Sequence, residues 1–135
     1  MENLLANDIV GKIGVTKYLC KIIWHNGTLI MDEPTEINGG DTGPDPYTAL
    51  LAALAGCTLS TLRMYIDRKG WDIPEISVQL NMAQQKETEL ITNIKREITF
   101  ASTITDEQHE RLLMIASKCP VSKILENKII IHTTA

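Results

Sequence analysis

Three cysteines are the residues of this 135-residue chain with the clearest chemical potential. Cys20, Cys57 and Cys119 are odd in number, lie far apart and match no spacing of zinc ligands. The sequence therefore predicts neither a metal site nor a secreted disulfide scaffold. A thiolate is both a nucleophile and the group that forms disulfides, so each thiol has either a packing role or a redox role.

Cys119 has local surroundings that favour a thiolate. If Pro120 is the first residue of a short helix, Cys119 is its N-cap, and Lys118 and Lys123 lie nearby. A helix N-terminus and neighbouring cations both stabilise a thiolate. The alternative is that Cys119 simply ends the preceding helix and packs, and the local residues do not separate the two.

Cys57 and Cys20 have surroundings more typical of packing. Cys57 follows Gly56 inside an apolar helix, where small residues permit close approach of another element and a buried thiol is inert. Cys20 shares a predicted strand face with Tyr18 and Trp24 and is expected to lie in the core. If the helices of Cys57 and Cys119 pack together, the two thiols could form a reversible disulfide.

The other ionisable side chains carry less chemical signal. We expect His25 in a turn, His109 on the exposed first turn of a helix and His132 on a final strand, in surface or structural roles. Arg96 and Glu97 are predicted to be solvated positions of a sheet.

Composition limits the class of protein. Hydrophobic residues make up 44% and charged residues 22% of the chain, which is typical of one soluble domain over residues 1–135. The net charge of −4 and the six aromatic residues give no reason to expect nucleic acid or an anionic membrane as partner. The longest apolar run, residues 49–57, is shorter than the roughly 20 residues of a membrane span. The N-terminus lacks a basic leader, so we expect a cytoplasmic protein.

The N-terminal third is predicted to be β. Residues 16–24 alternate as a strand, and Asn26-Gly27 predicts a type I′ turn into a partner strand at residues 28–31. Residues 8–15 are expected to add a further strand. Residues 34–45 are a loop by composition.

Two helices and a second hairpin follow. Asp45-Pro46 is expected to open a helix over residues 46–68, whose first half is apolar nearly all round and so has to be buried on every side. Thr105 begins a capping box and a second helix that ends at Cys119-Pro120. The remaining expected elements are strands at residues 75–82 and 90–104 around a polar tip at 84–89, a short helix at 121–126 and a closing strand at 129–132.

Two motifs resemble the signatures of the OsmC/Ohr family. The first comprises DEP at residues 32–34, GGDTGPDP at 39–46 and LLAALAGCT at 50–58. The second is KCPVSKIL at residues 118–125, in the variant of the OsmC-like branch. The resemblance runs from about Asp32 to the C-terminus and includes both Cys57 and Cys119.

The resemblance implies an α+β fold in which antiparallel sheets pack around two central helices and two chains intertwine as a homodimer. It also implies a cysteine-based thiol peroxidase that reduces organic hydroperoxides. Carried over by position, Cys57 attacks the peroxide and becomes a sulfenic acid, and Cys119 resolves it to a disulfide. A dithiol or thiol donor then reduces the disulfide, with no metal, flavin or haem cofactor.

The sequence departs from the family pattern at two activating residues. Family peroxidases use an Arg from the N-terminal strands and a Glu near the start of the first helix, whereas here the first Arg is Arg63 and Tyr47 or Thr48 stands at the Glu position. Arg63 lies beyond Cys57 on the same helix and is not expected to reach its sulfur. Candidate substitutes for the missing cation are Lys12, Lys17 and Lys21.

The departures keep two further hypotheses open. The first is a non-catalytic or weakly catalytic dimer that senses redox state or binds an apolar ligand. The second is a structural dimer in which both cysteines only pack.

Overall fold

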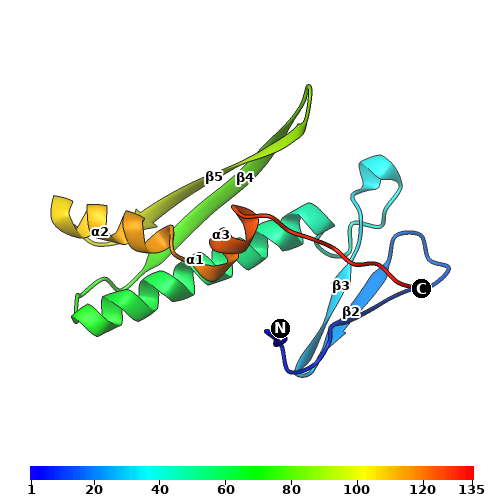
Figure 1. The fold of residues 1–135 in the computed structure, drawn as a ribbon, viewed down its shortest axis with the longest axis horizontal. Coiled ribbons are helices and arrows are strands. Elements are labelled where there is room, and N and C mark those ends of the chain that lie inside the picture. The colour runs from blue at the N-terminus through cyan, green and yellow to red at the C-terminus, as the bar shows by residue number, and fades with distance from the viewer. The chain divides into compact units, whose positions relative to one another are not determined.

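The computed structural model of the chain describes all 135 residues, which form two compact units, residues 1–50 and residues 51–135. The three α-helices and two antiparallel sheets confirm the expected α+β class. Figure 1 shows the elements along the chain.

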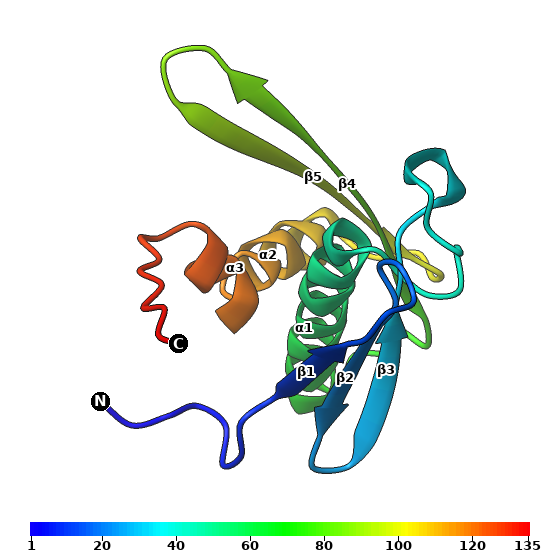
Figure 2. The same cartoon turned by 90° about the vertical axis from the view of Figure 1, so that its right-hand side faces the viewer.

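The unit of residues 1–50 is built on a three-stranded antiparallel sheet. Its strands are β1 (Val10–Ile13), β2 (Cys20–Trp24) and β3 (Gly27–Met31), in the order β1-β2-β3 (Figure 2). All three strands were expected, although β2 is shorter than predicted. Tyr18 adopts a left-handed φ of 63°, and the Leu19 N–H donates to the Thr16 carbonyl, so residues 16–19 turn instead of extending.

The hairpin between β2 and β3 turns one residue earlier than predicted. Trp24 pairs with Gly27, which leaves His25 and Asn26 as the turn residues. Neither of them has a positive φ, so the type I′ turn on Asn26-Gly27 is wrong. A side chain at Gly27 would meet the Trp24 ring at 2.7 Å, so this glycine provides space for the indole instead of a left-handed turn residue.

Asp32 organises the loop that follows β3 and contains the one-turn helix η1 (Thr35–Ile37). Its buried carboxylate accepts hydrogen bonds from the Thr42 hydroxyl at 2.6 Å and from the N–H groups of Glu33, Gly40 and Thr42. The Thr42 hydroxyl and the Glu33 N–H hold the pKa of Asp32 below its ordinary value, against the opposing effect of burial. The DEP segment at residues 32–34 and the glycine-rich segment that starts at residue 39 are therefore joined through one carboxylate.

Helix α1 (Pro46–Lys69) begins and ends where its local signals predict. The Asp45 carboxylate accepts from the Tyr47 N–H, and Gly70 leaves the helix with a left-handed φ of 69°. Burial follows a single stripe at four-residue spacing: Leu54, Thr58, Leu62 and Ile66. The expected burial on every side is thus wrong for one chain, because only one face of α1 is covered.

The unit of residues 51–135 packs a long hairpin and two short helices on this stripe. The hairpin joins β4 (Ile76–Lys86) to β5 (Leu90–Phe100), and the helices are α2 (Asp106–Ala116) and α3 (Pro120–Leu125). β4 extends into the predicted polar tip, and β5 stops before the predicted end at residue 104. The Thr105 capping box is confirmed, and the core consists of Leu62, Ile66, Ile73, Leu112 and Ala116.

The closing strand predicted at residues 129–132 is absent. A strand needs a neighbour for its N–H and C=O groups, and within one chain this segment pairs with no strand of either sheet. Ile129, Ile130 and Ile131 are exposed as a result. His132 therefore lies in an irregular segment, whereas His25 lies in a turn and His109 on the exposed start of α2, as expected.

Helix α1 also has the length and composition of a membrane-spanning helix, with a mean hydropathy of 1.5 over its most apolar 18 residues. The uninterrupted apolar run of residues 49–57 is shorter than this window because Thr58 ends it. Thr58 and Ser60 are too few to make the helix polar. A core helix of a soluble protein meets the same criterion.

The loop of residues 32–44 provides a test of backbone packing. A Cβ at Gly43 would lie 2.1 Å from the Ile30 carbonyl oxygen, and backbone cannot move aside as a side chain can. We expect Gly43→Ala to lower the free energy of unfolding by about 1–3 kcal/mol. Gly14→Ala is the matched control, because nothing lies within 4 Å of a Cβ there. Urea unfolding of both variants measures the difference, and equal stabilities would contradict the loop geometry.

Candidate functional site

Cys57 and Cys119 lie together although they are far apart in the sequence. Cys57 is half-buried on α1, and Cys119 is the N-cap of α3. The Val121 N–H, in the first turn of α3, donates to the Cys57 sulfur at 3.4 Å. The Cys57 thiol lies close enough to Cys119 to lower the pKa of that thiol, and both cysteines are free. The start of α3 therefore faces the thiol of α1, which brings the two sulfurs into one site.

Cys119 is the more enclosed of the two thiols, with no exposed surface. Its sulfur accepts from the Ser122 N–H at 3.4 Å and lies 3.2 Å from the Ser122 hydroxyl and 4.0 Å from the Thr58 hydroxyl. Burial opposes ionisation, but the Ser122 hydroxyl, the Ser122 N–H and the neighbouring Cys57 thiol together lower the pKa of the Cys119 thiol to about 7. The buried thiol is thus one that ionises near neutral pH.

The stabilising groups differ from those expected in the sequence. The prediction that Cys119 caps a helix starting at Pro120 is confirmed. Lys118 and Lys123 are exposed and do not contribute to the low pKa of Cys119, whose causes are hydroxyl, thiol and backbone N–H donors. The site therefore combines a helix N-cap with side-chain hydroxyls at the sulfur.

Arg96 belongs to the site although the sequence did not predict it there. One guanidinium nitrogen, Nη1, donates to the Thr58 hydroxyl at 2.9 Å and to the Ser122 hydroxyl at 2.8 Å. Arg96 is half-buried, so its assignment as a solvated sheet position is wrong, whereas Glu97 is exposed as predicted. The signal was present in the alternation of β5, which places position 96 on the inner face with Ile94 and Ile98.

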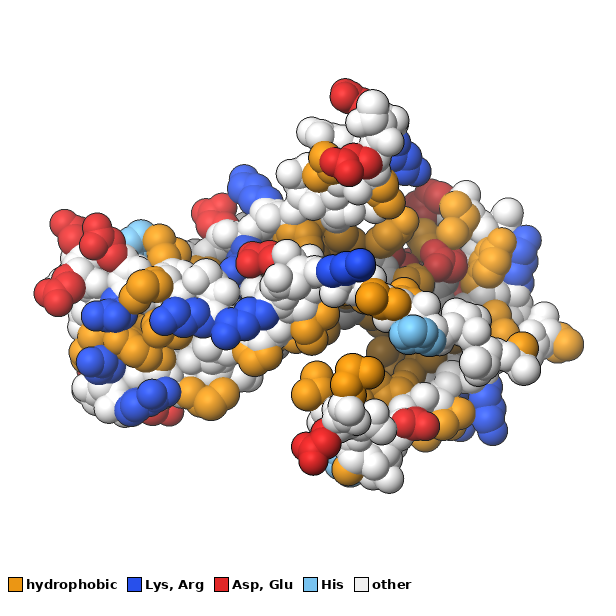
Figure 3. Space-filling model, viewed as in Figure 1, with side chains coloured by type: hydrophobic (Ala, Val, Ile, Leu, Met, Phe, Trp, Pro, Cys, Tyr) orange, Lys and Arg blue, Asp and Glu red, His pale blue; other side chains and the backbone are white.

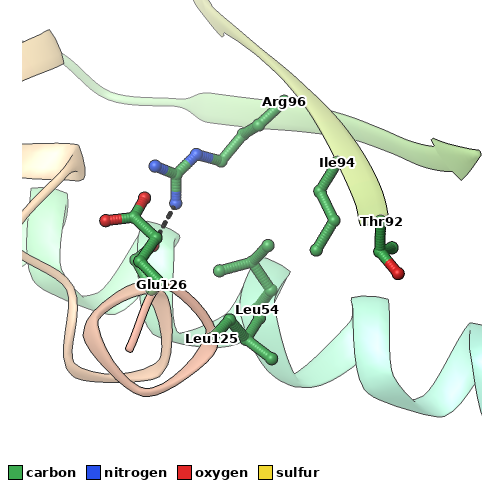
Figure 4. Close-up of a pocket in the computed structure, with 7 residues that line it drawn as sticks. Leu54, Thr92, Ile94, Arg96, Leu125 and Glu126 are labelled. Carbon is green, nitrogen blue, oxygen red and sulfur yellow. Dashed lines mark hydrogen bonds between the residues drawn. The ribbon is translucent and has the colours of Figure 1, made fainter. Parts of the chain in front are cut away.

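A cavity of about 350 Å³ opens beside these groups. Figure 4 shows Arg96 reaching from β5 toward α3, with Glu126 on the same side of the cavity. The apolar side chains of Leu54, Ile94 and Leu125 gather on the other side (Figure 4). Thr92 and Ser122 complete the lining. The cavity is polar at the end that adjoins Cys119, through Ser122, and apolar at the other.

The remaining candidates of the sequence belong to other parts of the chain. Cys20 is half-buried at the start of β2 and is not among the buried core residues. Lys12, Lys17 and Lys21 also belong to the unit of residues 1–50. Arg63 is held away from the thiols as expected, because it pairs with Asp67 and donates to the carbonyls of Ile73 and Pro74. No group of three His, Cys, Asp or Glu side chains is arranged to hold a metal ion.

The fold and the sequence both have relatives. The family of OsmC-like proteins matches residues 39–134. No curated protein matches the chain in sequence.

Several solved structures share the fold. One is a protein of Psychrobacter arcticus with a proposed role in osmotic stress and detoxification, which has a TM-score of 0.74 at 18% identity and covers 92% of this chain and 90% of its own. An organic hydroperoxide resistance protein OsmC of Legionella pneumophila has a TM-score of 0.67 at 16% identity over 90% of each chain.

The organic hydroperoxide resistance protein OhrB of Bacillus subtilis has a TM-score of 0.64 at 19% identity, covering 90% of this chain and 91% of its own. Identities this low show a common fold alone. The family match is the stronger finding, because it spans well over half of the sequence and includes both Cys57 and Cys119. This chain therefore belongs to the OsmC-like protein family.

Proposed function

We propose that the protein is a cysteine-based thiol peroxidase that reduces organic hydroperoxides. The observation that carries the proposal is the meeting of Cys57 and Cys119 at the N-terminus of α3, where each sulfur accepts a backbone N–H. Two relatives of the same fold are organic hydroperoxide resistance proteins. Cys57 is the peroxidatic residue because it is the more accessible sulfur, and the enclosed Cys119 is the resolving residue.

The reaction balances with these two thiols and one external reductant. The Cys57 thiolate attacks the terminal oxygen of the hydroperoxide, the O–O bond breaks, and the alkoxide takes a proton from solvent to leave as an alcohol. The Cys57 sulfenic acid condenses with the Cys119 thiol, which forms the disulfide and releases water. A dithiol donor reduces this disulfide by exchange and is itself oxidised, which restores both thiols. The cytoplasm, where thiols are kept reduced, suits this cycle.

We also propose that the working form is an intertwined homodimer. Much apolar surface is uncovered on the single chain, including Ile13 and Tyr47, and Figure 3 shows many apolar side chains on the visible face. Ile129, Ile130 and Ile131 form an extended apolar segment that has no strand partner in its own chain. Burying such surface is the main force for association, and a second copy of the chain supplies both apolar faces and strand edges.

One observation favours a second candidate function. The cavity beside Ser122 has an apolar wall of Leu54, Ile94 and Leu125, which suits an apolar ligand. The chain also lacks an Arg in its N-terminal strands and a Glu near the start of α1, which are the positions where the family resemblance leads one to expect them. A dimer that binds an apolar ligand or senses redox state, with slow turnover, is therefore the alternative.

Substitution of each cysteine separates these functions. We expect the wild-type protein to consume cumene hydroperoxide in the presence of a dithiol, and Cys57→Ser to lose this activity by at least a hundredfold, because the nucleophile is gone. Cys119→Ser should be oxidised at Cys57 without forming an intramolecular disulfide. Cys20→Ser is the matched control and should keep full activity. Undiminished turnover by Cys57→Ser would exclude the mechanism, and slow wild-type turnover with ligand binding would favour the second function.

Gly56 tests the dimer. Nothing in the single chain lies within 4 Å of a Cβ at Gly56, so Gly56→Leu in a monomer should stabilise α1 by about 1 kcal/mol through helix propensity. If a partner helix packs against this small residue, the larger side chain should instead weaken association. Sedimentation equilibrium at several concentrations measures the association, and urea unfolding measures the stability. A monomeric wild-type protein would contradict the proposed dimer.

A further inference from the structure

We propose that Arg96 is a positioning residue which, through the hydroxyl of Ser122, holds the Cys119 sulfur as a thiolate. The proposed function gives this arrangement its catalytic meaning, but the ionisation of Cys119 can be measured without peroxide. Arg96 lies in the chain far from both motifs, 26 positions before Ser122. It touches neither sulfur and acts through the hydroxyls that surround one of them.

The hydrogen-bond capacity of Ser122 gives the direction of this effect. A hydroxyl has one hydrogen to donate and two lone pairs, whereas a guanidinium can only donate. The Ser122 oxygen therefore accepts from Arg96 Nη1 at 2.8 Å. Its own hydrogen is left free to point at the Cys119 sulfur, 3.2 Å away. A donor to the sulfur favours the thiolate over the thiol.

Thr58 fixes the guanidinium in place. Its hydroxyl donates to the Leu54 carbonyl within α1 at 2.7 Å and accepts from the same Arg96 nitrogen at 2.9 Å. The Thr58 hydrogen is thus committed to the backbone, and Ser122 is the principal hydroxyl donor to Cys119. Arg96 joins α1 to α3 through two hydroxyls that are themselves buried.

The charges around the site support this assignment. The single ion pair of the structure joins Arg63 and Asp67, so no carboxylate lies within 4.0 Å of the Arg96 guanidinium. Glu126 lines the same cavity without pairing with it, and Lys118 and Lys123 are exposed. A half-buried cation whose direct side-chain partners are neutral hydroxyls is stabilised by a nearby negative charge. The Cys119 thiolate supplies that charge, because the Ser122 hydroxyl contacts both the guanidinium and the sulfur.

A thiolate at Cys119 would act in both halves of the proposed reaction. It accepts the hydrogen of the Cys57 thiol as Cys57 attacks the peroxide, so Cys57 is oxidised to the sulfenic acid while Cys119 becomes the thiol that then condenses with it. In the reductive half, a donor thiolate attacks the Cys57 sulfur, the disulfide breaks, and Cys119 departs with the electron pair. The thiol of lower pKa is the better leaving group.

Titration of Cys119 alone tests the role of Arg96. In the Cys20→Ser/Cys57→Ser protein, the ultraviolet absorbance of the thiolate against pH reports only the remaining cysteine, after correction with the same protein carrying Cys119→Ser. We expect a midpoint below the ordinary value of about 8.5, and a midpoint higher by about one pH unit after Arg96→Met. Lys95→Met is the matched control, since it removes a charge from the exposed face of the same strand. It should leave the midpoint unchanged.

Ser122→Ala keeps the test decisive if Arg96→Met fails to fold. Because Arg96 acts through Ser122, we expect Ser122→Ala also to raise the midpoint. Arg96→Met should then raise it little further in the Ser122→Ala protein. Arg96→Lys should restore only part of the effect, because one ammonium cannot match the planar guanidinium. An unchanged midpoint in folded Arg96→Met or Ser122→Ala protein would overturn the proposal. A shifted midpoint in a protein without peroxidase activity would overturn only the proposed function.

Discussion

The sulfur of Cys119 is enclosed by donors that come from two different helices, and the site depends on this enclosure. Ser122 supplies a hydroxyl and an N–H from α3, while the Cys57 thiol approaches from α1. A sulfur without solvent would ordinarily stay protonated, because burial penalises its charge. Here the donors replace the lost water, so burial and ionisation are compatible. The contact between α1 and α3 therefore both excludes water from the sulfur and favours its ionisation.

Local signals predicted most of the elements that build this site. Asp45-Pro46, the Thr105 capping box and Cys119-Pro120 each specify a helix start within a few adjacent residues. Such signals work because capping is a short-range hydrogen bond that needs no tertiary partner. The position of Cys119 at the N-cap of α3 could be predicted in this way, and Cys119 is one of the two thiols of the site.

Features that need a distant partner could not be predicted in the same way. Arg96 meets Thr58 across 38 positions of sequence, and only the strand alternation of β5 indicated that it faces inward. The strand expected at residues 129–132 has apolar residues but no partner strand in its own chain. In each case tertiary contacts, or their absence, decided the outcome.

The uneven burial of α1 connects the proposed chemistry to the proposed dimer. Its stripe from Leu54 to Ile66 is covered by its own chain, whereas Gly56 and Cys57 lie off that stripe and are open or only half-covered. Cys57 thus lies at the border between the covered and uncovered faces of the helix. A partner that covers the open face would desolvate Cys57 and strengthen the hydrogen bond from Val121, because electrostatic interactions grow as water is excluded. The surface that remains apolar in one chain is then the same surface that completes the environment of the more accessible thiol.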